Sequence, residues 1–216
     1  MEFFSLPNTA RVNKVIPKNA FDAYTNSKQK KMFSDLILRI TWLQKLSQDT
    51  VNLEGKEIKE IQIFKIELKV REEIQPLLEI IDKAIPYNII FIIQELDSSY
   101  LSTSTKHPHP LNANNSVIDW TFKTPWFLNN ENKFAMHLKK NLDAVYHDFC
   151  IQISGKKNMA RKSLQDLVHY NKQIYLLEKE IQQLQTNIKN SKQYKYKVEL
   201  NLLLKQRSKE LQSLIS

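Results

Sequence analysis

Three charged residues, Asp49, Glu67 and Lys69, have the types and spacing that could support metal-dependent hydrolysis. Asp49 opens a short predicted strand, and the Glu67-Leu68-Lys69 triplet follows on the next one after 17 intervening residues. Because side chains alternate along a strand, Glu67 and Lys69 are expected on the same face. Carboxylates are ligands that Mg²⁺ prefers, and a neighbouring lysine can help to position or activate the attacking water. The spacing therefore predicts a catalytic centre with Asp49 and Glu67 as metal ligands and Lys69 beside them.

This pattern resembles the signature of metal-dependent nucleases of the PD-(D/E)XK type. In that signature an acidic residue at the start of one strand is followed by an acid-x-Lys triplet on the next strand. The predicted order of elements also resembles the αβββαβ core of those nucleases. The sequence departs from the signature at Gln48, where those nucleases have proline. The resemblance implies Mg²⁺ as the cofactor. We expect no cofactor if the protein is not a nuclease of this type.

A simpler interpretation of the same residues stays open. A Glu-x-Lys triplet is common by chance in a chain with 32 Lys plus Arg and 23 Asp plus Glu. A cross-strand ion pair explains it equally well. Such folds also occur as inactive binding modules, because fold does not dictate function. We therefore expect a non-catalytic protein in preference to an enzyme.

The other residues that could carry chemistry exclude several classes of protein. Gly55 and Gly155 are the only glycines, so the chain has no glycine-rich loop for nucleotide phosphates. Cys150 is the single cysteine, so neither an intramolecular disulfide nor a cysteine-based zinc site can form. His107 and His109 lie in a polar segment without nearby acids or thiols, and we expect them to be exposed rather than metal-bound.

Hydrophobic periodicity predicts a mixed α/β or α+β domain over residues 1–155. The predicted elements, in chain order, are a helix at 21–38, strands at 40–46, 50–53 and 61–70, a helix at 72–85, a strand at 88–93, a surface loop at 97–116, a strand at 117–122, a helix at 131–153 and a linker at 154–157. The start of the chain has no signal-peptide pattern, and the longest apolar runs are too short to span a bilayer. We expect a cytoplasmic protein without membrane contact.

Residues 156–216 are predicted to form a helical tail. Two series of mostly apolar residues recur at intervals of three and four, Leu167, Tyr170, Ile174, Leu177, Ile181, Leu184 and Ile188, then Tyr194, Val198, Asn201, Leu204, Ser208, Leu211 and Ile215. The polar break at 190–192 favours an antiparallel hairpin, and one continuous dimerising coiled coil is the alternative. A buried Asn201 would fix the register of either arrangement.

The tail also concentrates the positive charge of the chain. It has 13 Lys plus Arg against 5 Asp plus Glu, while the whole chain has a net charge of +9. A basic appendage of this kind suggests contact with a polyanion or an acidic partner. We expect such contacts from Lys156, Lys157, Arg161, Lys162, Lys195 and Lys197.

Five strings of the sequence resemble a bacterial family known as domain of unknown function 4391. They are VNKVIPKNAF (12–21), ITWLQKLSQDT (40–50), EIQIFKIELK (60–69), IDKAIPYNIIF (81–91) and KVELN (197–201). The resemblance implies no established activity. Members of the family tend to be encoded beside helicases and DNA methyltransferases in restriction or phage-defence gene clusters, which implies a role linked to DNA.

These observations together favour an accessory or interaction subunit of a bacterial DNA-restriction or anti-phage defence assembly. Its partner would be a larger helicase or DNA methyltransferase subunit, with DNA as a further ligand. Two alternatives stay open: a Mg²⁺-dependent PD-(D/E)XK-like nuclease, and a coiled-coil homodimer, formed through the tail, with no role on DNA.

Overall fold

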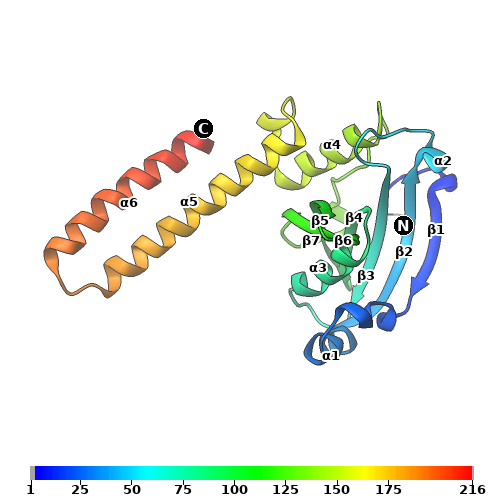
Figure 1. Ribbon diagram of the computed structural model, residues 1–216, viewed down its shortest axis with the longest axis horizontal. Coiled ribbons are helices and arrows are strands. Elements are labelled where there is room, and N and C mark those ends of the chain that lie inside the picture. Colours follow the sequence, from blue (N-terminus) through cyan, green and yellow to red (C-terminus); the bar gives the residue numbers. More distant parts are fainter. Residues whose placement is uncertain (1–2, 216) are drawn as a thin grey trace. The chain divides into compact units, whose positions relative to one another are not determined.

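The chain folds into two compact units, the first ending at Ser163 and the second beginning at Leu164. The computed structural model describes residues 3–215, except for the side chains of residues 112–115. The first unit is a mixed α/β domain, and the second is a pair of long helices (Figure 1).

A seven-stranded sheet forms the centre of the first unit. Its strands are β1 (Arg11–Ile16), β2 (Ile37–Ser47), β3 (Glu60–Leu68), β4 (Asn88–Glu95), β5 (Ser98–His109), β6 (Asn112–Lys123) and β7 (Phe127–Leu128). Strands β1 to β6 neighbour one another in sequence order, and β7 pairs with β5. Strands β3 and β4 pair in parallel, whereas the other pairs are antiparallel.

Helices and short 3-10 turns connect these strands. They are η1 (Asn8–Ala10), η2 (Lys18–Tyr24), α1 (Ser27–Leu36), α2 (Gln48–Val51), α3 (Gln75–Ala84), η3 (Asn129–Glu131), α4 (Leu142–Ser154) and η4 (Lys157–Met159). Helix α3 forms the crossover between the parallel strands β3 and β4, as a parallel connection requires.

One face of the sheet packs against α1, η2 and α3. The alternating residues Phe64, Ile66 and Leu68 of β3 lie in the same buried cluster as Leu77 and Ile81 of α3. This confirms the face predicted for β3, and it confirms residues 88–93 as a buried strand. Burial of these apolar surfaces is the main force that holds α3 on the sheet.

The opposite face packs against α4. Thr103 of β5 lies directly opposite Ile90 of β4, so their side chains share one face. The hydroxyl of Tyr146, from α4, lies 2.9 Å from the Thr103 hydroxyl and donates to the Ser104 carbonyl at 2.7 Å. Tyr146 and Phe149 are fully buried there. The sheet is therefore covered by helices on both faces.

The predicted αβββαβ core is not confirmed. Residues 50–53 were expected to be a strand, but the chain leaves β2 through the short helix α2, and Asn52 has a left-handed φ of 53°. The Thr50 hydroxyl donates to the Lys45 carbonyl at 2.8 Å and accepts from the Ser47 N–H at 2.9 Å. These local bonds favour a turn over an extended strand. In addition, β1 precedes α1 and pairs with β2, and no strand was predicted there.

The predicted surface loop at 97–116 is wrong. This stretch forms β5 and the start of β6, paired as a hairpin. Its hydroxyl-rich sequence resembles a loop, but Ser99, Ser102, Thr103 and Ser104 are almost completely buried. Hydroxyl groups can enter a sheet interior when each finds a hydrogen-bond partner. The strand predicted at 117–122 is confirmed as part of β6.

The helix predicted at 131–153 begins later, at Leu142, where the Asn141 side chain accepts from the Ala144 N–H at 2.9 Å. Asn141 is a preferred N-cap residue, and it therefore sets the start of α4. Gly155, with a φ of 68°, ends the helix in the left-handed conformation that glycine favours.

The second unit is an antiparallel hairpin of α5 (Leu164–Asn190) and α6 (Tyr194–Ile215). The Tyr170 hydroxyl near the start of α5 donates to the Leu214 carbonyl near the end of α6 at 3.0 Å. Glu180 and Arg207 form an ion pair at 3.0 Å between the two helices. The structure thus has the hairpin rather than one continuous helix. No helix in the described part of the chain is long and apolar enough to cross a membrane.

The predicted seam is right for α5 and shifted for α6. In α5, Leu167, Tyr170, Ile174 and Leu184 are buried. In α6 the buried residue is Leu200, whereas Asn201 is exposed and donates to the Lys197 carbonyl at 2.8 Å. Asn201 therefore does not fix the register of the hairpin.

A carboxylate at the start of α4 organises the turn before β3. Asp143 accepts from the backbone N–H groups of Lys56, Glu57 and Ile58 at 2.6, 2.9 and 3.0 Å. The turn needs Gly55, because a Cβ atom there would lie 1.8 Å from the Ile58 carbonyl oxygen. Burial opposes ionisation of the Asp143 carboxyl, but the three N–H groups outweigh it and lower the pKa of Asp143.

We expect Asp143→Asn to lower the free energy of unfolding by about 1 kcal/mol at pH 7, because an amide accepts these bonds more weakly and solvent screens the difference. The pKa of Asp143 is lower in the folded chain. Its contribution is therefore complete above the unfolded pKa of about 3.9 and is lost as the pH falls through the lowered value. Urea unfolding at several pH values measures this, with Asp35→Asn, at an exposed position of α1, as the control. A difference from wild type that stays constant down to a pH of about 2 would contradict this role.

Candidate functional site

The structure does not bring the predicted metal ligands together. Asp49 is exposed in α2, directly after β2. In the antiparallel register of β2 and β3, Ser47 pairs with Glu60, whereas Glu67 pairs with Arg39 at the other end. The seven-residue step from Glu60 to Glu67 corresponds to about 23 Å along the strand. Two ligands of one Mg²⁺ ion must both lie about 2.0–2.1 Å from it, so Asp49 and Glu67 cannot share an ion in this fold.

Glu67 and Lys69 instead make separate structural contacts. The Glu67 carboxylate lies 3.2 Å from the Lys65 ammonium and 3.9 Å from the Arg39 guanidinium. The Lys69 ammonium donates to the Ser34 carbonyl near the end of α1 at 2.8 Å. The ion pair between β2 and β3 matches the simpler interpretation of the Glu-x-Lys triplet. In the part of the chain that the structure describes, no three His, Cys, Asp or Glu residues gather in a metal-binding group.

The two histidines that were considered as metal ligands, His107 and His109, both lie in β5, and His109 is its last residue. His107, on β5, has its Nδ1 atom 3.1 Å from the Asp119 carboxylate of β6. The Nδ1 atom of His109 accepts from the Leu111 N–H at 3.2 Å, within the turn between these strands. His107 is exposed, as expected, and His109 is half-buried. These contacts stabilise the hairpin locally.

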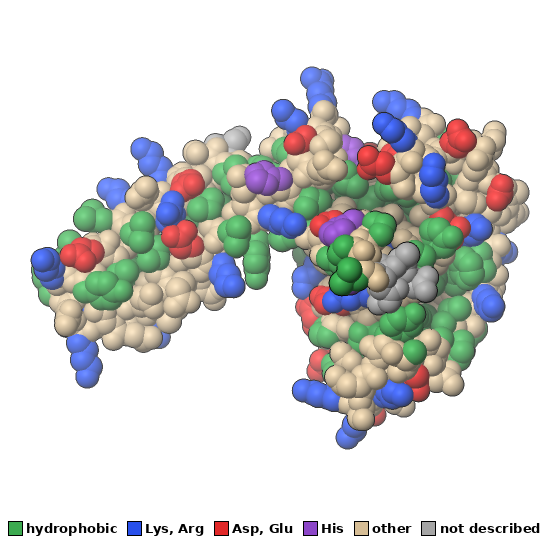
Figure 2. Space-filling model, in the orientation of Figure 1, with side chains coloured by type: hydrophobic (Ala, Val, Ile, Leu, Met, Phe, Trp, Pro, Cys, Tyr) green, Lys and Arg blue, Asp and Glu red, His purple; other side chains and the backbone are tan. Residues whose placement is uncertain are grey.

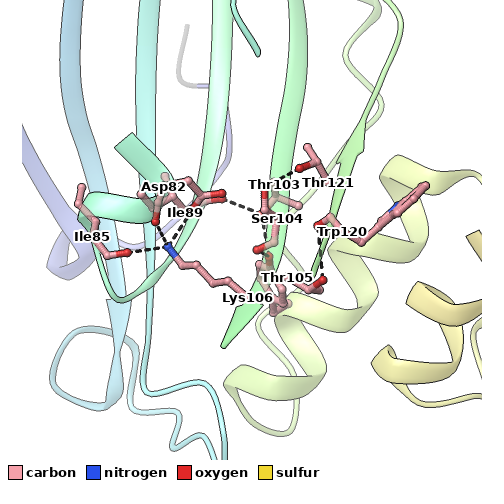
Figure 3. Close-up of polar contacts among 10 residues, drawn as sticks. Asp82, Ile85, Ile89, Thr103, Ser104, Thr105, Lys106, Trp120 and Thr121 are labelled. Carbon is pink, nitrogen blue, oxygen red and sulfur yellow. Dashed lines mark hydrogen bonds and ion pairs between the residues drawn. The ribbon is translucent and has the colours of Figure 1, made fainter. Parts of the chain in front are cut away.

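A buried ion pair joins α3 to β5 (Figure 3). The Lys106 ammonium donates to the Asp82 carboxylate at 2.8 Å, to the Asp82 carbonyl at 2.7 Å and to the Ile85 carbonyl at 2.6 Å. The two side chains are only 2% and 1% exposed. Burial raises the pKa of Asp82 and lowers that of Lys106, and their mutual attraction opposes both shifts.

The contacts of Lys106 define what this pair can do. An ammonium has three N–H donors, and all three are used within the protein. Two of the acceptors are carbonyl groups at the end of α3, which a helix leaves without internal partners. The side chain therefore caps α3 and joins it to β5, and it has no donor left for a substrate. The pair is a structural site rather than a catalytic one.

Hydroxyl groups beside this pair are bonded in the same way. Thr103 donates to the Ile89 carbonyl at 2.6 Å, and the Ser104 and Thr121 hydroxyls lie 3.0 Å apart. Figure 3 shows Thr103, Ser104 and Thr105 following one another along β5 before Lys106, with Thr121 on the neighbouring strand β6. Sequence reasoning missed the whole group, because it treated the stretch as a loop. The alternation Thr103-Ser104-Thr105-Lys106, with β-branched residues, was the available signal for a strand.

A shallow pocket of about 300 Å³ lies near the junction of β6 and β7. It is lined by Glu73, Tyr100, Lys123, Thr124, Pro125 and Trp126. The Trp126 ring contacts Tyr100 edge-on at 4.8 Å, and the Arg71 guanidinium lies 4.9 Å from its centroid. Lys123 and Glu73 pair with each other at 2.6 Å. Because these charges already have partners within the protein, the pocket offers an aromatic surface rather than a reactive group.

The predicted basic residues fall into two groups. Lys156, Lys157, Arg161 and Lys162 lie between α4 and α5, at the end of the first unit. Lys195 and Lys197 lie in the first turn of α6, in the second unit.

The turn of the hairpin combines cations with exposed aromatic rings. We call it the hairpin tip and define it as residues 189–197, with lysines at 189, 192, 195 and 197 and tyrosines at 194 and 196. The Tyr194 and Tyr196 side chains are 82% and 46% exposed. No acidic residue occurs between Glu180 and Glu199. In Figure 2 the end of the hairpin at which α5 turns into α6 shows lysines beside apolar side chains. The tip is therefore a cationic surface with aromatic groups available for contact.

Taken together, these features define a mixed α/β domain that carries a basic, antiparallel helical hairpin. The chain matches the family model described as Domain of unknown function (DUF4391) over residues 4–211, and it belongs to this family. No curated protein matches the chain, and no solved structure matches it.

We expect Lys106→Met to lower the free energy of unfolding by about 3–5 kcal/mol, because it leaves the Asp82 carboxyl buried without its cation. Urea unfolding at pH 7 measures the effect. Lys123→Met is the matched control, because it breaks an equally short ion pair with Glu73 whose side chains are 50% and 60% exposed. It should cost less than about 1 kcal/mol. Equal losses of unfolding free energy in the two variants would show that the buried Lys106–Asp82 pair is no more important for stability than an exposed ion pair.

Proposed function

We propose that this protein is an accessory subunit of a bacterial DNA-restriction or anti-phage defence assembly and that its helical hairpin contacts nucleic-acid phosphates. The observation that carries the proposal is the hairpin tip. It has four lysines and two exposed tyrosines on a segment without any acidic residue. Lysine neutralises phosphates, and a tyrosine ring can stack on a base.

The charge distribution of the hairpin supports the hairpin tip as the place of nucleic-acid contact. Of the five acidic residues in α5 and α6, Glu180 and Glu210 are paired with Arg207, away from the tip. Glu199 is the acidic residue that follows the tip in sequence, so four lysines face one carboxylate at this end of the hairpin and the tip keeps a net positive charge. The cations at 156–162 would add a second set of backbone contacts.

The proposed role within a larger assembly rests on the resemblance to this family, which implies gene neighbourhoods with helicases and DNA methyltransferases. A helicase or methyltransferase subunit is accordingly the proposed partner. The nuclease alternative is not retained, because the fold places Asp49 and Glu67 at opposite ends of the β2–β3 pair.

Charge reversal at the tip tests the proposal. We expect a quadruple variant with glutamate in place of Lys189, Lys192, Lys195 and Lys197 to bind duplex and single-stranded DNA at least tenfold more weakly at low salt. Its plot of log affinity against log salt should also be shallower, because fewer counterions are released. Fluorescence anisotropy with labelled oligonucleotides, over a series of salt concentrations, measures both quantities.

A control variant with the same change in net charge shows whether the loss of affinity depends on the position of the lysines or only on the total charge of the protein. Lys28, Lys31, Lys133 and Lys139 are exposed on the α/β domain, and their reversal gives the same total charge. This control should keep most of the affinity. A parallel reversal of Lys156, Lys157, Arg161 and Lys162 measures the share of the second group. If both the tip variant and the domain control lose affinity equally, or if the wild type binds no nucleic acid, the proposal is wrong.

A further inference from the structure

One side of α6 carries apolar and cationic side chains that the hairpin leaves uncovered. We call it the outer stripe and define it as Tyr194, Lys195, Val198, Leu202, Lys205 and Lys209. At 100° per residue these positions fall within an arc of about 100°. Leu200, the buried residue of α6, lies on the other side of the helix from Leu202. The stripe therefore faces away from the seam with α5.

The apolar members of the outer stripe are unusually exposed for their type. Tyr194 is 82%, Leu202 66% and Val198 44% exposed. They are spaced at i, i+4 and i+8, which places them in a row of about 12 Å along the helix. Single exposed leucines are common on proteins, but an ordered row marks a surface for contact. A hairpin of two helices has one internal seam, so a third helix can be added on this side.

The charges of the outer stripe select the kind of partner. Lys195, Lys205 and Lys209 lie within the same arc as the apolar row, Lys195 beside its first turn and Lys205 and Lys209 past its C-terminal end, and all three are exposed. The two acidic residues of α6, Glu199 and Glu210, fall outside the arc. A partner helix with an apolar row and with carboxylates beside and beyond that row would match this pattern, and charge complementarity of this kind guides specific association.

The same charges disfavour a second copy of this chain. A twofold dimer would place the stripe against itself and bring the lysines of both copies together. Nucleic acid would satisfy the lysines, but it offers no apolar surface of matching shape to Val198 and Leu202.

We infer that the outer stripe of α6 is a docking surface for an acidic amphipathic helix of a protein partner. This inference concerns the partner of the proposed accessory subunit. Tyr194 and Lys195 belong to both the hairpin tip and the outer stripe, whereas Val198, Leu202, Lys205 and Lys209 belong to the stripe alone, and docking on these four does not require DNA binding by the tip. The partner's contact segment would have a leucine-like row at helical spacing, with aspartate or glutamate beside and beyond it.

The test uses the full-length protein and a synthetic probe helix. The probe is a peptide of about 15 residues, long enough to cover the stripe, with leucines at i, i+4 and i+8 and glutamates beside and beyond this row. Isothermal titration should show one-to-one binding. Leu202→Glu should weaken it at least tenfold, whereas Leu176→Glu should leave it unchanged. Leu176 is the matched control, because it is a leucine of α5 with 62% exposure and lies outside the stripe.

Charge exchange provides the decisive comparison. The double variant Lys205→Glu, Lys209→Glu should lose the acidic probe and gain binding of a probe in which lysines replace the glutamates. Failure of the acidic probe to bind the wild type, or equal binding to Leu202→Glu, would overturn the inference. So would a wild-type dimer in light scattering that becomes a monomer in Leu202→Glu. DNA affinity measured on the same variants keeps this result separate, because Leu202→Glu should retain it and the tip variant should not.

Discussion

Lys106 places a full positive charge where water cannot reach it, and so the protein must supply every one of its hydrogen-bond partners. It does so with the Asp82 carboxylate and two carbonyls at the end of α3. The position of α3 on the sheet, and the register of β5 beside β4, must be compatible with these three bonds. This one ammonium therefore links the parallel β3–α3–β4 unit to the antiparallel strands that follow it.

That link explains how a polar segment became part of the core. On one face α4 packs against β5 and β6, and on the other α3 packs against β6 and is joined to β5 by Lys106, so the Ser and Thr side chains of β5 are buried. Their hydroxyls then bond to one another, to backbone carbonyls and to Tyr146. The free-energy cost of removing these hydroxyl groups from water is offset by the hydrogen bonds that they form within the protein, not by apolar contacts.

The parts of the fold that could be predicted from sequence are those held by apolar periodicity. Strands β3 and β4, helix α3 and the α5 seam all have patterns in which burial follows the spacing of large apolar residues. The β5–β6 hairpin could not be found this way, because its burial depends on partners far away in sequence, Asp82 and Tyr146. The predicted α6 seam began on the wrong side of the helix, because Tyr194 and Val198 are apolar yet exposed. Apolar periodicity therefore selected residues of the outer stripe. The metal-site prediction rested on strand alternation and spacing, but Lys69 lies beyond the end of β3, and the antiparallel register of β2 and β3 sets Asp49 at the far end from Glu67.

We propose that the hairpin makes the functional contacts and that the polar sites of the α/β domain stabilise its fold. An amide chemical-shift titration of the full-length protein with a short DNA duplex, in the presence of Mg²⁺, tests this division most directly. We predict that the largest shifts lie at the hairpin tip, residues 189–197, and that the amides of Asp49 and Glu67 stay unchanged. Shifts concentrated at Asp49 and Glu67 with the tip unaffected, or no shifts at all, would contradict it.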